Sequence, residues 1–350
     1  MKVLHVLNSR IYSGAEKVVS QIIKDFEKTG EAQMVYCSPE SDMVARMLAE
    51  QGIPYLPVDS MTPGNLKRII TEQKPDLIHA HDMRASLMSA LCCGKIPLIS
   101  HIHNNAYDAR SLSPKSIGYL YAGFRAKKII WVSNSSYNGY LFHKLFARKS
   151  LVLYNIINTE EIFTKKALDS NSYDFDMIYL GRLTHEKNPQ RLLRLCAALK
   201  ERKPDLKVAI VGTGDLEEEL KQLQVQLGLQ DNVQFLGFQS NPMKMLHDSK
   251  VMILTSLWEG TPMCALEAMA LGTPIVSTPS DGMRDLVEDG VSGYLTDDDG
   301  VMAEKLLKIM NDPAHRQMLS ENAKEKFSRF NDAPKYHQTI AACYREGRKP

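Results

Sequence analysis

The chain has 350 residues, of which 44% are hydrophobic, enough for the cores of two domains and too many for a disordered protein. Its charges nearly cancel, at +2 overall, and no apolar stretch approaches the length of a membrane-spanning helix. The start of the chain has no signal-peptide pattern, and the six cysteines are scattered without a CxxC pair, so we expect a cytoplasmic protein with reduced thiols.

Short apolar runs alternate with helical patterns along the whole chain. In the first half, the expected strands are residues 3–7, 33–37, 77–79, 98–102, 129–132 and 151–154, and the expected helices are 15–28, 42–51, 65–72 and 135–146. The pattern then restarts with strands at 177–180, 207–211, 233–235, 251–254 and 274–277, and helices at 190–200, 216–226, 243–248, 302–310, 314–330 and 334–344. This alternation predicts an α/β fold of two doubly wound parallel sheets covered by helices.

The restart of the pattern divides the chain into domains. We expect a first Rossmann-like domain at residues 1–157, a polar linker at 158–172 and a second Rossmann-like domain at 173–331. A last helix within 332–350 is expected to pack back on the first domain. Because ligands of parallel sheets bind beyond the carboxyl ends of the strands, two sheets that face each other would hold a ligand in the cleft between them.

Three strand-to-helix turns have residues that suit an anionic ligand. Ser13 and Gly14 follow the first strand, where backbone N–H groups of a helix N-terminus can approach an anion. The turn LGRLTHEKN, residues 180–188, places Arg182 and Lys187 near a helix N-terminus and suits a diphosphate. The third turn is VGTGD, residues 211–215. A tight turn or solvated surface charge is the alternative explanation for each.

The helix expected at residues 263–271 contains one carboxylate among apolar residues. Thr261 is expected to cap the helix, with Pro262 at its first position and Gly272 at its end. A helix that is apolar on every side is usually buried, so the Glu267 carboxylate should be buried with it.

Glu259 lies eight residues before Glu267, in the loop that leads to this helix, where Gly260 and Thr261 can present backbone N–H groups. Two carboxylates beside such N–H groups suit a ligand rich in hydroxyl groups, such as a sugar nucleotide, since each hydrogen bond to a carboxylate contributes about 1.5–3 kcal/mol. The alternative is a structural role, in which Glu267 pairs with an internal arginine or caps a neighbouring helix.

Histidines occur in two pairs at the ends of expected strands, in DLIHAHD (residues 76–82) and LISHIHNN (residues 98–105). HxH pairs suggest zinc, but no cysteine or further carboxylate nearby completes either set, so we expect no metal. One histidine of each pair is expected to face the cleft and the other to belong to the core or a turn.

The stretch from 109 to 159 contains no acidic residue and mixes aromatic residues with cations. Residues 1–160 carry 19 Lys/Arg against 13 Asp/Glu, whereas residues 161–350 carry 24 against 28. Such a segment suits an acceptor-binding surface or an anionic membrane, and core aromatics with solvated lysines are the alternative. No nucleic-acid-binding module accompanies the charge. The candidate surface residues are Arg110, Lys115, Tyr119, Arg125, Lys127, Lys128, Lys144, Arg148 and Lys149.

The segment EGTPMCALEAMALGTP, residues 259–274, resembles the E-x7-E motif of retaining GT-B glycosyltransferases of glycosyltransferase family 4. Further stretches occur in the order typical of that family: the turn at Gly14, DLIHAHD, the strand ending in His103, YNIINTEEIF, GRLTHEKN, VGTGDLEEEL, VQFLGF and DLVEDGVSGYL. The resemblance covers essentially the whole chain. It implies the GT-B fold, with the acceptor bound by the first domain and a nucleotide sugar by the second.

The resemblance also implies a role for each matching residue. Arg182 and Lys187 would hold the donor diphosphate, Glu267 would accept hydrogen bonds from the ribose, Glu259 would contact the donor sugar, and His103 would approach the transferred sugar. The other implied donor-binding residues are Ser13, Gly14, Gly260, Thr261, Pro262 and Met263. The first turn has one glycine where the family often has two, and Asn104 stands where many relatives have an acid, which bears on the choice of sugar or acceptor.

By resemblance, the reaction is transfer of a sugar from a nucleotide diphosphate, with UDP as the expected nucleotide, to a glycan or lipid-linked acceptor of cell-surface polysaccharide synthesis, with retention of configuration. The catalytic residues implied are Glu259, His103, Arg182 and Lys187. No DxD motif stands near the expected site, so no metal is expected. The enzyme would work in the cytoplasm, at the inner face of the membrane if the acceptor is a lipid. The alternatives are a nucleotide-sugar epimerase, a sugar phosphorylase or a non-catalytic subunit that binds nucleotide sugars.

Overall fold

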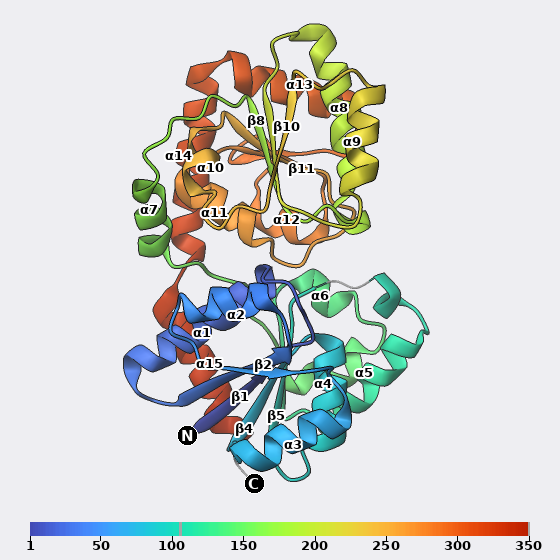
Figure 1. Ribbon diagram of the computed structural model, residues 1–350, viewed down its shortest axis with the longest axis vertical. Helices are drawn as coiled ribbons and strands as arrows, with labels where there is room; N and C mark the ends of the chain where they lie inside the picture. The colour runs from blue at the N-terminus through green and yellow to red at the C-terminus, as the bar shows by residue number, and fades with distance from the viewer. Residues whose placement is uncertain (105–106, 349–350) are drawn as a thin grey trace. The chain divides into compact units, whose positions relative to one another are not determined.

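The structure is a computed structural model, and it describes residues 1–104 and 107–348. The chain divides into two compact units (Figure 1). Unit 1 comprises residues 1–156 and 332–350, and unit 2 comprises residues 157–331. Each unit is built around one parallel sheet with helices, which confirms the expected α/β class with two Rossmann-like domains.

The sheet of unit 1 has seven strands, and every pairing in it is parallel. Across the sheet the order is β3 (Tyr55–Val58), β2 (Gln33–Pro39), β1 (Lys2–Val6), β4 (Leu77–His81), β5 (Leu98–Ile102), β6 (Lys128–Trp131) and β7 (Ser150–Val152). The strand order reverses between β1 and β4. In such sheets the crevice beside the carboxyl ends of the strands at this switch point is the usual place for a ligand.

The helices of unit 1 cover this sheet (Figure 1). They are α1 (Gly14–Thr29), α2 (Asp42–Ala49), α3 (Pro63–Gln73), α4 (Asp82–Cys92), α5 (Pro114–Arg125), α6 (Asn134–Asn138) and α15 (Ala333–Gly347), with the 3-10 turns η1 (Tyr107–Arg110) and η2 (His143–Lys149). The last helix, α15, packs against α1 and β5, and Figure 1 shows it in red beside the blue α1. The aromatic rings of Phe26 and Tyr344 meet there, with centroids 5.2 Å apart.

The sheet of unit 2 has six parallel strands in the order β10 (Val233–Gly237), β9 (Val208–Val211), β8 (Met177–Leu180), β11 (Val251–Leu254), β12 (Ile275–Ser277) and β13 (Gly293–Leu295). Its helices are α7 (Thr159–Leu168), α8 (Pro189–Arg202), α9 (Glu217–Gln226), α10 (Met243–Asp248), α11 (Met263–Leu271), α12 (Asp281–Leu286), α13 (Asp299–Asn311) and α14 (Pro313–Phe330), with the 3-10 turn η3 (His185–Lys187). Here the strand order reverses between β8 and β11, and their carboxyl ends therefore mark a second expected ligand site.

The cores follow from the apolar strands. Every residue of β5, β9 and β11 is buried, as expected for strands that are covered by helices on both faces. No disulfide joins the cysteines, and four of the six are buried. Among the described residues, no helix is both long and apolar enough to cross a bilayer.

The sequence analysis missed β3, α4, α5, α12 and β13. Strand β3 contains Pro57 and lies at the edge of the sheet, where the missing N–H of a proline is tolerated. For β13, only three residues pair with β12. Short elements of this kind have little periodicity to recognise in a sequence.

The expected helix at residues 135–146 is wrong. The chain forms the short helix α6, turns at Gly139 and then continues as the 3-10 turn η2. Tyr140 lies at this break, fully buried, and its hydroxyl group donates to the carbonyl of Ser116 at 2.9 Å. Burial of this ring and its hydrogen bond outweighs the weak helical pattern of the segment.

The segment expected to be a linker, residues 158–172, contains helix α7, which packs against α10 and α11 within unit 2. The side chain of Asn331, the last residue of unit 2, forms hydrogen bonds with the backbone of Ile157, its first residue. Its Oδ1 accepts from the N–H of Ile157 at 2.9 Å, and its Nδ2 donates to the carbonyl of Ile157 at 3.0 Å. Ile157 is buried, so these backbone groups depend on Asn331 rather than on water.

We expect the substitution Asn331→Ala to lower the free energy of unfolding of unit 2 by about 1–3 kcal/mol, because it leaves buried polar groups of Ile157 without their partner. Thermal unfolding followed by circular dichroism measures the loss. The matched control is Asn322→Ala, which removes one exposed bond, to the carbonyl of Val291. Equal melting temperatures for the two variants would contradict the role assigned to Asn331.

Candidate active site

In unit 2, two loops lie side by side at the carboxyl edge of the sheet because the strands that precede them, β8 and β11, are neighbours. The first loop carries Lys187, and the second leads to α11. The Thr255 hydroxyl group donates to the carbonyls of Lys187 and Asn188, and the N–H of Leu257 donates to the carbonyl of Glu186 at 2.8 Å. These hydrogen bonds fix the two loops against each other.

The central contact of this edge is an ion pair between Lys187 and Glu259. The Nζ atom lies 2.5 Å from Oε1 of Glu259, and the Ser256 hydroxyl group donates to the same oxygen at 2.6 Å. Lys187 is 15% and Glu259 7% exposed, so the pair is largely removed from water. Removal of one partner from a buried pair typically costs about 3–5 kcal/mol, because the other charge stays buried.

Arg182 lies near this pair in sequence but has a different environment. Its guanidinium group is 44% exposed and binds Glu186 at 2.7 Å. The two cations that the sequence analysis grouped together therefore differ in burial and partner, and Arg182 is the one with more access to solvent.

Helix α11 runs over residues 263–271 as predicted, and Glu267 is 3% exposed within it. Its C-terminal stop is also as predicted, since Gly272 adopts a left-handed conformation with φ of 79°. The expected N-terminus is wrong by one residue: Pro262 occupies the cap position, and Thr261 precedes it. Proline has no N–H to lose at a helix start, so it suits this position as well.

Glycines allow a close approach of backbone segments around these loops. A Cβ atom on Gly282, at the start of α12, would lie 1.5 Å from the carbonyl oxygen of Gly260. Similarly, Cβ atoms on Gly212 and Gly214 would lie 1.9 Å and 2.3 Å from carbonyl oxygens of the turn that holds Arg182. Close packing against the neighbouring turn therefore explains both glycines of VGTGD. This supports the alternative that VGTGD is a tight turn without a ligand.

In unit 1, the turn at Ser13 and Gly14 is held by Glu16. A single oxygen, Oε2, accepts from both the N–H and the hydroxyl group of Ser13 at 2.9 Å. Glu16 is buried, and burial is the main reason that its pKa is raised. This carboxylate lines a pocket of about 240 Å³ beside the carboxyl ends of β1 and β4, together with Asp82, Arg84 and Lys115.

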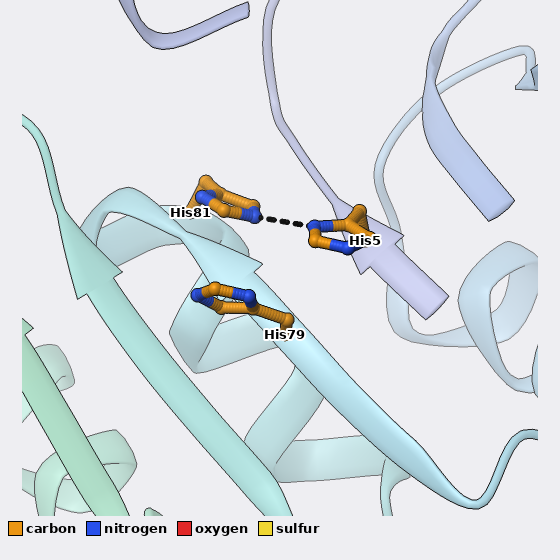
Figure 2. A group of neighbouring side chains, drawn as sticks. All are labelled: His5, His79 and His81. Carbon is orange, nitrogen blue, oxygen red and sulfur yellow. Dashed lines mark hydrogen bonds between the residues drawn. The ribbon is translucent and has the colours of Figure 1, made fainter. Parts of the chain in front are cut away.

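Five histidines from three neighbouring strands form a stack on one face of this sheet. His5 on β1 lies opposite His79 on β4, and His81 lies opposite His101 on β5. Figure 2 shows His5, His79 and His81, with a hydrogen bond between the first and the last. His103 follows β5 and is half-buried, and its N–H donates to Asp82. Of the first pair, His79 lies in the core, and His81 is buried but lines the pocket beside β1 and β4.

Burial lowers the pKa of all five histidines, to about 3 for His5 and His103. The rings are therefore neutral, and each has one N–H and one lone pair. His5 Nε2 lies 3.4 Å from the sulfur of Met34, which only accepts, so this nitrogen carries the proton. His5 Nδ1 then accepts from His81 Nε2 at 3.0 Å, and His81 Nδ1 accepts from His103 Nε2 at 2.9 Å. The lone pair of His103 is left on Nδ1.

Two sets of these rings, His5/His79/His81 and His81/His101/His103, have nitrogen atoms within 4.8 Å of one another and are candidates for a metal site. The hydrogen bonds argue against it. Nδ1 of His5 and Nε2 of His81 bond each other in the first set, and Nδ1 of His81 and Nε2 of His103 do so in the second, so these nitrogens are engaged without an ion. Neither set includes a carboxylate or thiolate to balance a divalent charge in the core. Hydrogen bonding accounts for His5, His81 and His103 without an ion.

The acid-free segment contributes to both the core and the surface. Tyr119, expected on the surface, is buried, and its hydroxyl group bonds Ser100 at 2.8 Å, so this prediction is wrong. Lys149 donates to the carbonyls of Phe124 and Ala126 near the end of α5. Further candidates have protein partners: Lys128 binds Glu346, Lys115 binds Asp108, and Arg125 donates to the carbonyl of Gly94. The other candidates in this set, Arg110, Lys127, Lys144 and Arg148, are exposed.

Two family models match the chain. The model of glycosyltransferase family 4 matches residues 12–161, and the model of group 1 glycosyl transferases matches residues 160–326, so together they span both units. A crystal structure of the Anabaena protein HepE in complex with UDP-glucose covers 98% of each chain with a TM-score of 0.84 at 22% identity. Such structural neighbours have the GT-B fold. The chain belongs to the GT-B glycosyltransferases.

Relatives of this glycosyltransferase occur in archaea and bacteria. An uncharacterized glycosyltransferase of Methanocaldococcus jannaschii is 30% identical over 60% of this chain and 57% of its own length. The match therefore spans little more than half of that relative. An Escherichia coli UDP-Gal:alpha-D-GlcNAc-diphosphoundecaprenol alpha-1,3-galactosyltransferase is 26% identical over 75% of this chain and 73% of its own length.

Sequence analysis of this glycosyltransferase missed four residues of the site: His5, Glu16, Ser256 and Gly282. For Glu16 the signal was present, since Ser-Gly-Ala-Glu has the spacing of a helix capping box. The others have no local signal. His5 and Gly282 gain their roles from strands and loops distant in sequence, and Ser256 gains its role from the position of Glu259.

We expect Gly282→Ala to lower the free energy of unfolding of unit 2 by about 1–3 kcal/mol, because the new Cβ forces the Gly260 carbonyl out of place. Urea unfolding measures this change. The control is Gly64→Ala in the first turn of α3, where no atom lies within 4 Å of the new Cβ. A Gly282→Ala protein as stable as the control would contradict the close approach.

The histidine stack predicts an acid-sensitive unit 1. Since their folded pKa values lie far below 6.5, the unfolded chain binds protons that the folded unit excludes. Stability is therefore full above about pH 6.5 and falls as the pH drops toward 3, with a limiting slope of about 1.4 kcal/mol per pH unit for each histidine. Urea unfolding at several pH values, followed by the fluorescence of the buried Trp131 in a Trp258→Phe background, measures this slope.

His101 offers a clean variant, because neither of its ring nitrogens has a hydrogen-bond partner among the described residues. His101→Phe keeps a ring in the stack and should reduce the limiting slope by about 1.4 kcal/mol per pH unit. The exposed His185, changed to Gln, should leave the slope unaltered. An unchanged slope in His101→Phe would show that this ring is already charged or solvated.

Proposed function

We propose that this glycosyltransferase moves a sugar from a UDP-sugar to a lipid-linked diphosphate glycan, with retention of configuration, in the synthesis of a cell-surface polysaccharide. The observation that carries the proposal is the arrangement at the start of α11, where the Lys187–Glu259 pair and the buried Glu267 flank one loop. The UDP-glucose bound by HepE supports the choice of donor, and the name of the Escherichia coli relative supports the donor, the acceptor class and the alpha linkage.

The donor would lie beyond the carboxyl ends of β8 and β11. The diphosphate would be bound by Arg182 and Lys187, and the ribose hydroxyl groups by Glu267. An ammonium group has three N–H donors, so Lys187 can keep its contact with Glu259 while it binds a phosphate oxygen. The loop backbone from Gly260 through Thr261 and Pro262 to Met263 would complete the donor site in unit 2. The resemblance implies Ser13 and Gly14 as further donor-binding residues.

Glu259 would bind the transferred sugar. Lys187 and Ser256 both bind its Oε1, and the second oxygen of the carboxylate is suited to a sugar hydroxyl group. Because Lys187 contacts Glu259, the cation at the leaving group and the carboxylate at the sugar are positioned by one interaction. By resemblance, His103 would approach the transferred sugar.

The reaction would pass through an oxocarbenium-like state. The bond between the anomeric carbon and the diphosphate breaks, and its electron pair goes to the leaving phosphate oxygen, where Arg182, Lys187 and helix N–H groups stabilise the charge. The acceptor oxygen bonds to the anomeric carbon on the same face and gives its proton to the leaving phosphate. Glu267 is engaged by the ribose in this scheme, so the two glutamates do not act as the nucleophile and acid of a retaining glycosidase.

We propose that no divalent metal is needed. The acidic run at residues 297–299 is engaged within the protein: Asp297 and Asp299 bind Arg191 at 2.6 Å and 2.7 Å, and Asp298 caps α13. The UDP-sugar and the lipid-linked acceptor would meet the enzyme in the cytoplasm, at the inner face of the membrane.

The test is a panel of UDP- and GDP-sugars, each with and without EDTA, assayed by thermal shift and by nucleotide release. We expect one UDP-sugar to raise the melting temperature and to release UDP slowly with EDTA present. Glu267→Ala and Arg182→Ala should each weaken binding at least 10-fold, since each removes a charged hydrogen-bond partner of the donor. Nuclear magnetic resonance of the glycoside product should show the anomeric configuration of the donor.

The alternatives give different results in the same assay. An epimerase converts the sugar without an acceptor, and a non-catalytic subunit binds the donor but never releases UDP. Arg191→Ala is the control for loss of a cation, because its guanidinium group binds acidic residues at the start of α13 rather than the proposed donor site. Failure of every nucleotide sugar to stabilise the protein would overturn the proposed function.

A further inference from the structure

The described part of unit 1 exposes a group of large apolar side chains on and beside α5. Leu112, just before the helix, is 75% exposed, Ile117 55%, Tyr121 46% and Phe124 62%, and Leu145 in η2 is 61% exposed. We refer to these five residues as the α5 face. Apolar side chains exposed singly need no explanation, but a group of them on one element marks a binding surface.

Helix α5 is apolar on two opposite sides. Tyr119, Ala122 and Gly123 are buried against the core. Ile117, Tyr121 and Phe124 recur at intervals of four and three residues, so they form one stripe along the other side. The first stripe holds the helix on the sheet, whereas the side chains of the second stripe are largely exposed.

Contacts between α5 and η2 join Leu145 to this stripe. The rings of Phe124 and Phe146 meet edge to face with centroids 5.2 Å apart, and Lys149 donates to the carbonyl of Phe124. A Cβ atom on Gly123 would touch the Phe146 ring at 2.5 Å, so η2 lies directly against the helix. Leu145 precedes Phe146 in this turn and is 61% exposed, so η2 adds one exposed apolar side chain to this part of unit 1.

Exposed cations accompany the α5 face. Lys115 and Arg125 lie on α5, Lys144 and Arg148 in η2, and Arg110 in the preceding turn η1. Between residues 107 and 149 the sequence contains one acidic residue, Asp108, and Lys115 binds it. A surface of exposed apolar and aromatic side chains with a rim of cations is complementary to an anionic lipid bilayer, where apolar groups enter the interface and Lys and Arg meet the headgroups.

We propose that the α5 face is a membrane-docking surface that inserts Ile117, Tyr121, Phe124 and Leu145 into the interface of an anionic bilayer. The inference rests on the proposed function, since docking would bring a membrane-embedded acceptor to unit 1. It refines the surface expected from the sequence, because Tyr119 lies in the core and the exposed apolar stripe of α5 provides the insertion.

The experiment measures sedimentation of the whole protein with vesicles of 30% phosphatidylglycerol in phosphatidylcholine, and with vesicles of phosphatidylcholine alone. Binding to the anionic vesicles that weakens at high salt is expected. The double variant Ile117→Ser/Phe124→Ser should reduce this binding at least 10-fold. The matched control is Leu168→Ser/Val225→Ser, which removes two equally exposed apolar side chains from unit 2 and should bind as the unaltered protein does.

A second readout separates docking from catalysis. Thermal stabilisation by the UDP-sugar should be the same in the double variant, whereas transfer to a long-chain polyprenyl diphosphate acceptor in the vesicles should fall with the loss of binding. Loss of stabilisation by every nucleotide sugar would implicate the proposed function instead. The docking surface is overturned if the unaltered protein does not bind anionic vesicles at low salt, if the double variant binds equally well, or if light scattering shows a dimer that the double variant abolishes.

Discussion

The ion pair between Lys187 and Glu259 is the contact on which the proposed donor site of unit 2 depends. It joins the loop after β8 to the loop after β11. The Ser256 hydroxyl group donates a hydrogen bond to Glu259, and the Thr255 hydroxyl group donates one to the carbonyl of Lys187. The two strands are neighbours only because the strand order reverses between them, so the pair is a product of the doubly wound topology. A cation suited to the leaving phosphate and a carboxylate suited to the sugar are thus positioned together, and neither can be moved without disturbing the other.

Unit 1 achieves its rigidity differently, through neutral histidines instead of charges. The thioether of Met34 determines the direction of the hydrogen bonds from His103 through His81 to His5, and burial keeps the rings uncharged. The same arrangement makes the stability of unit 1 sensitive to acid. The rings are neutral in the folded unit, so their protonation at low pH favours the unfolded chain. Tyr344 of the last helix bonds His79, so the C-terminal segment is part of this packing.

Both units therefore place the polar residues described above at the carboxyl ends of the strands beside the switch point. The α5 face lies on neither edge. It belongs to a helix whose inner side already satisfies the core, and this separation lets an exposed apolar stripe vary without cost to the fold. Donor binding and membrane docking would accordingly be carried by different elements, which is why the two can be tested with separate variants.

Sequence alone was sufficient for the class of the fold and for the position of α11, because buried parallel strands and an all-apolar helix leave strong local patterns. It also indicated Glu259, Glu267, Arg182 and Lys187 as candidate site residues through a motif that is continuous in the chain. The tertiary structure alone decided which of them touch: Lys187 pairs with Glu259, and Arg182 does not. It likewise brought His5 to the other histidines, moved Tyr119 into the core and exposed Phe124. Contacts between strands, and the side of a helix that faces the core, depend on neighbours distant in sequence, and no local pattern records them.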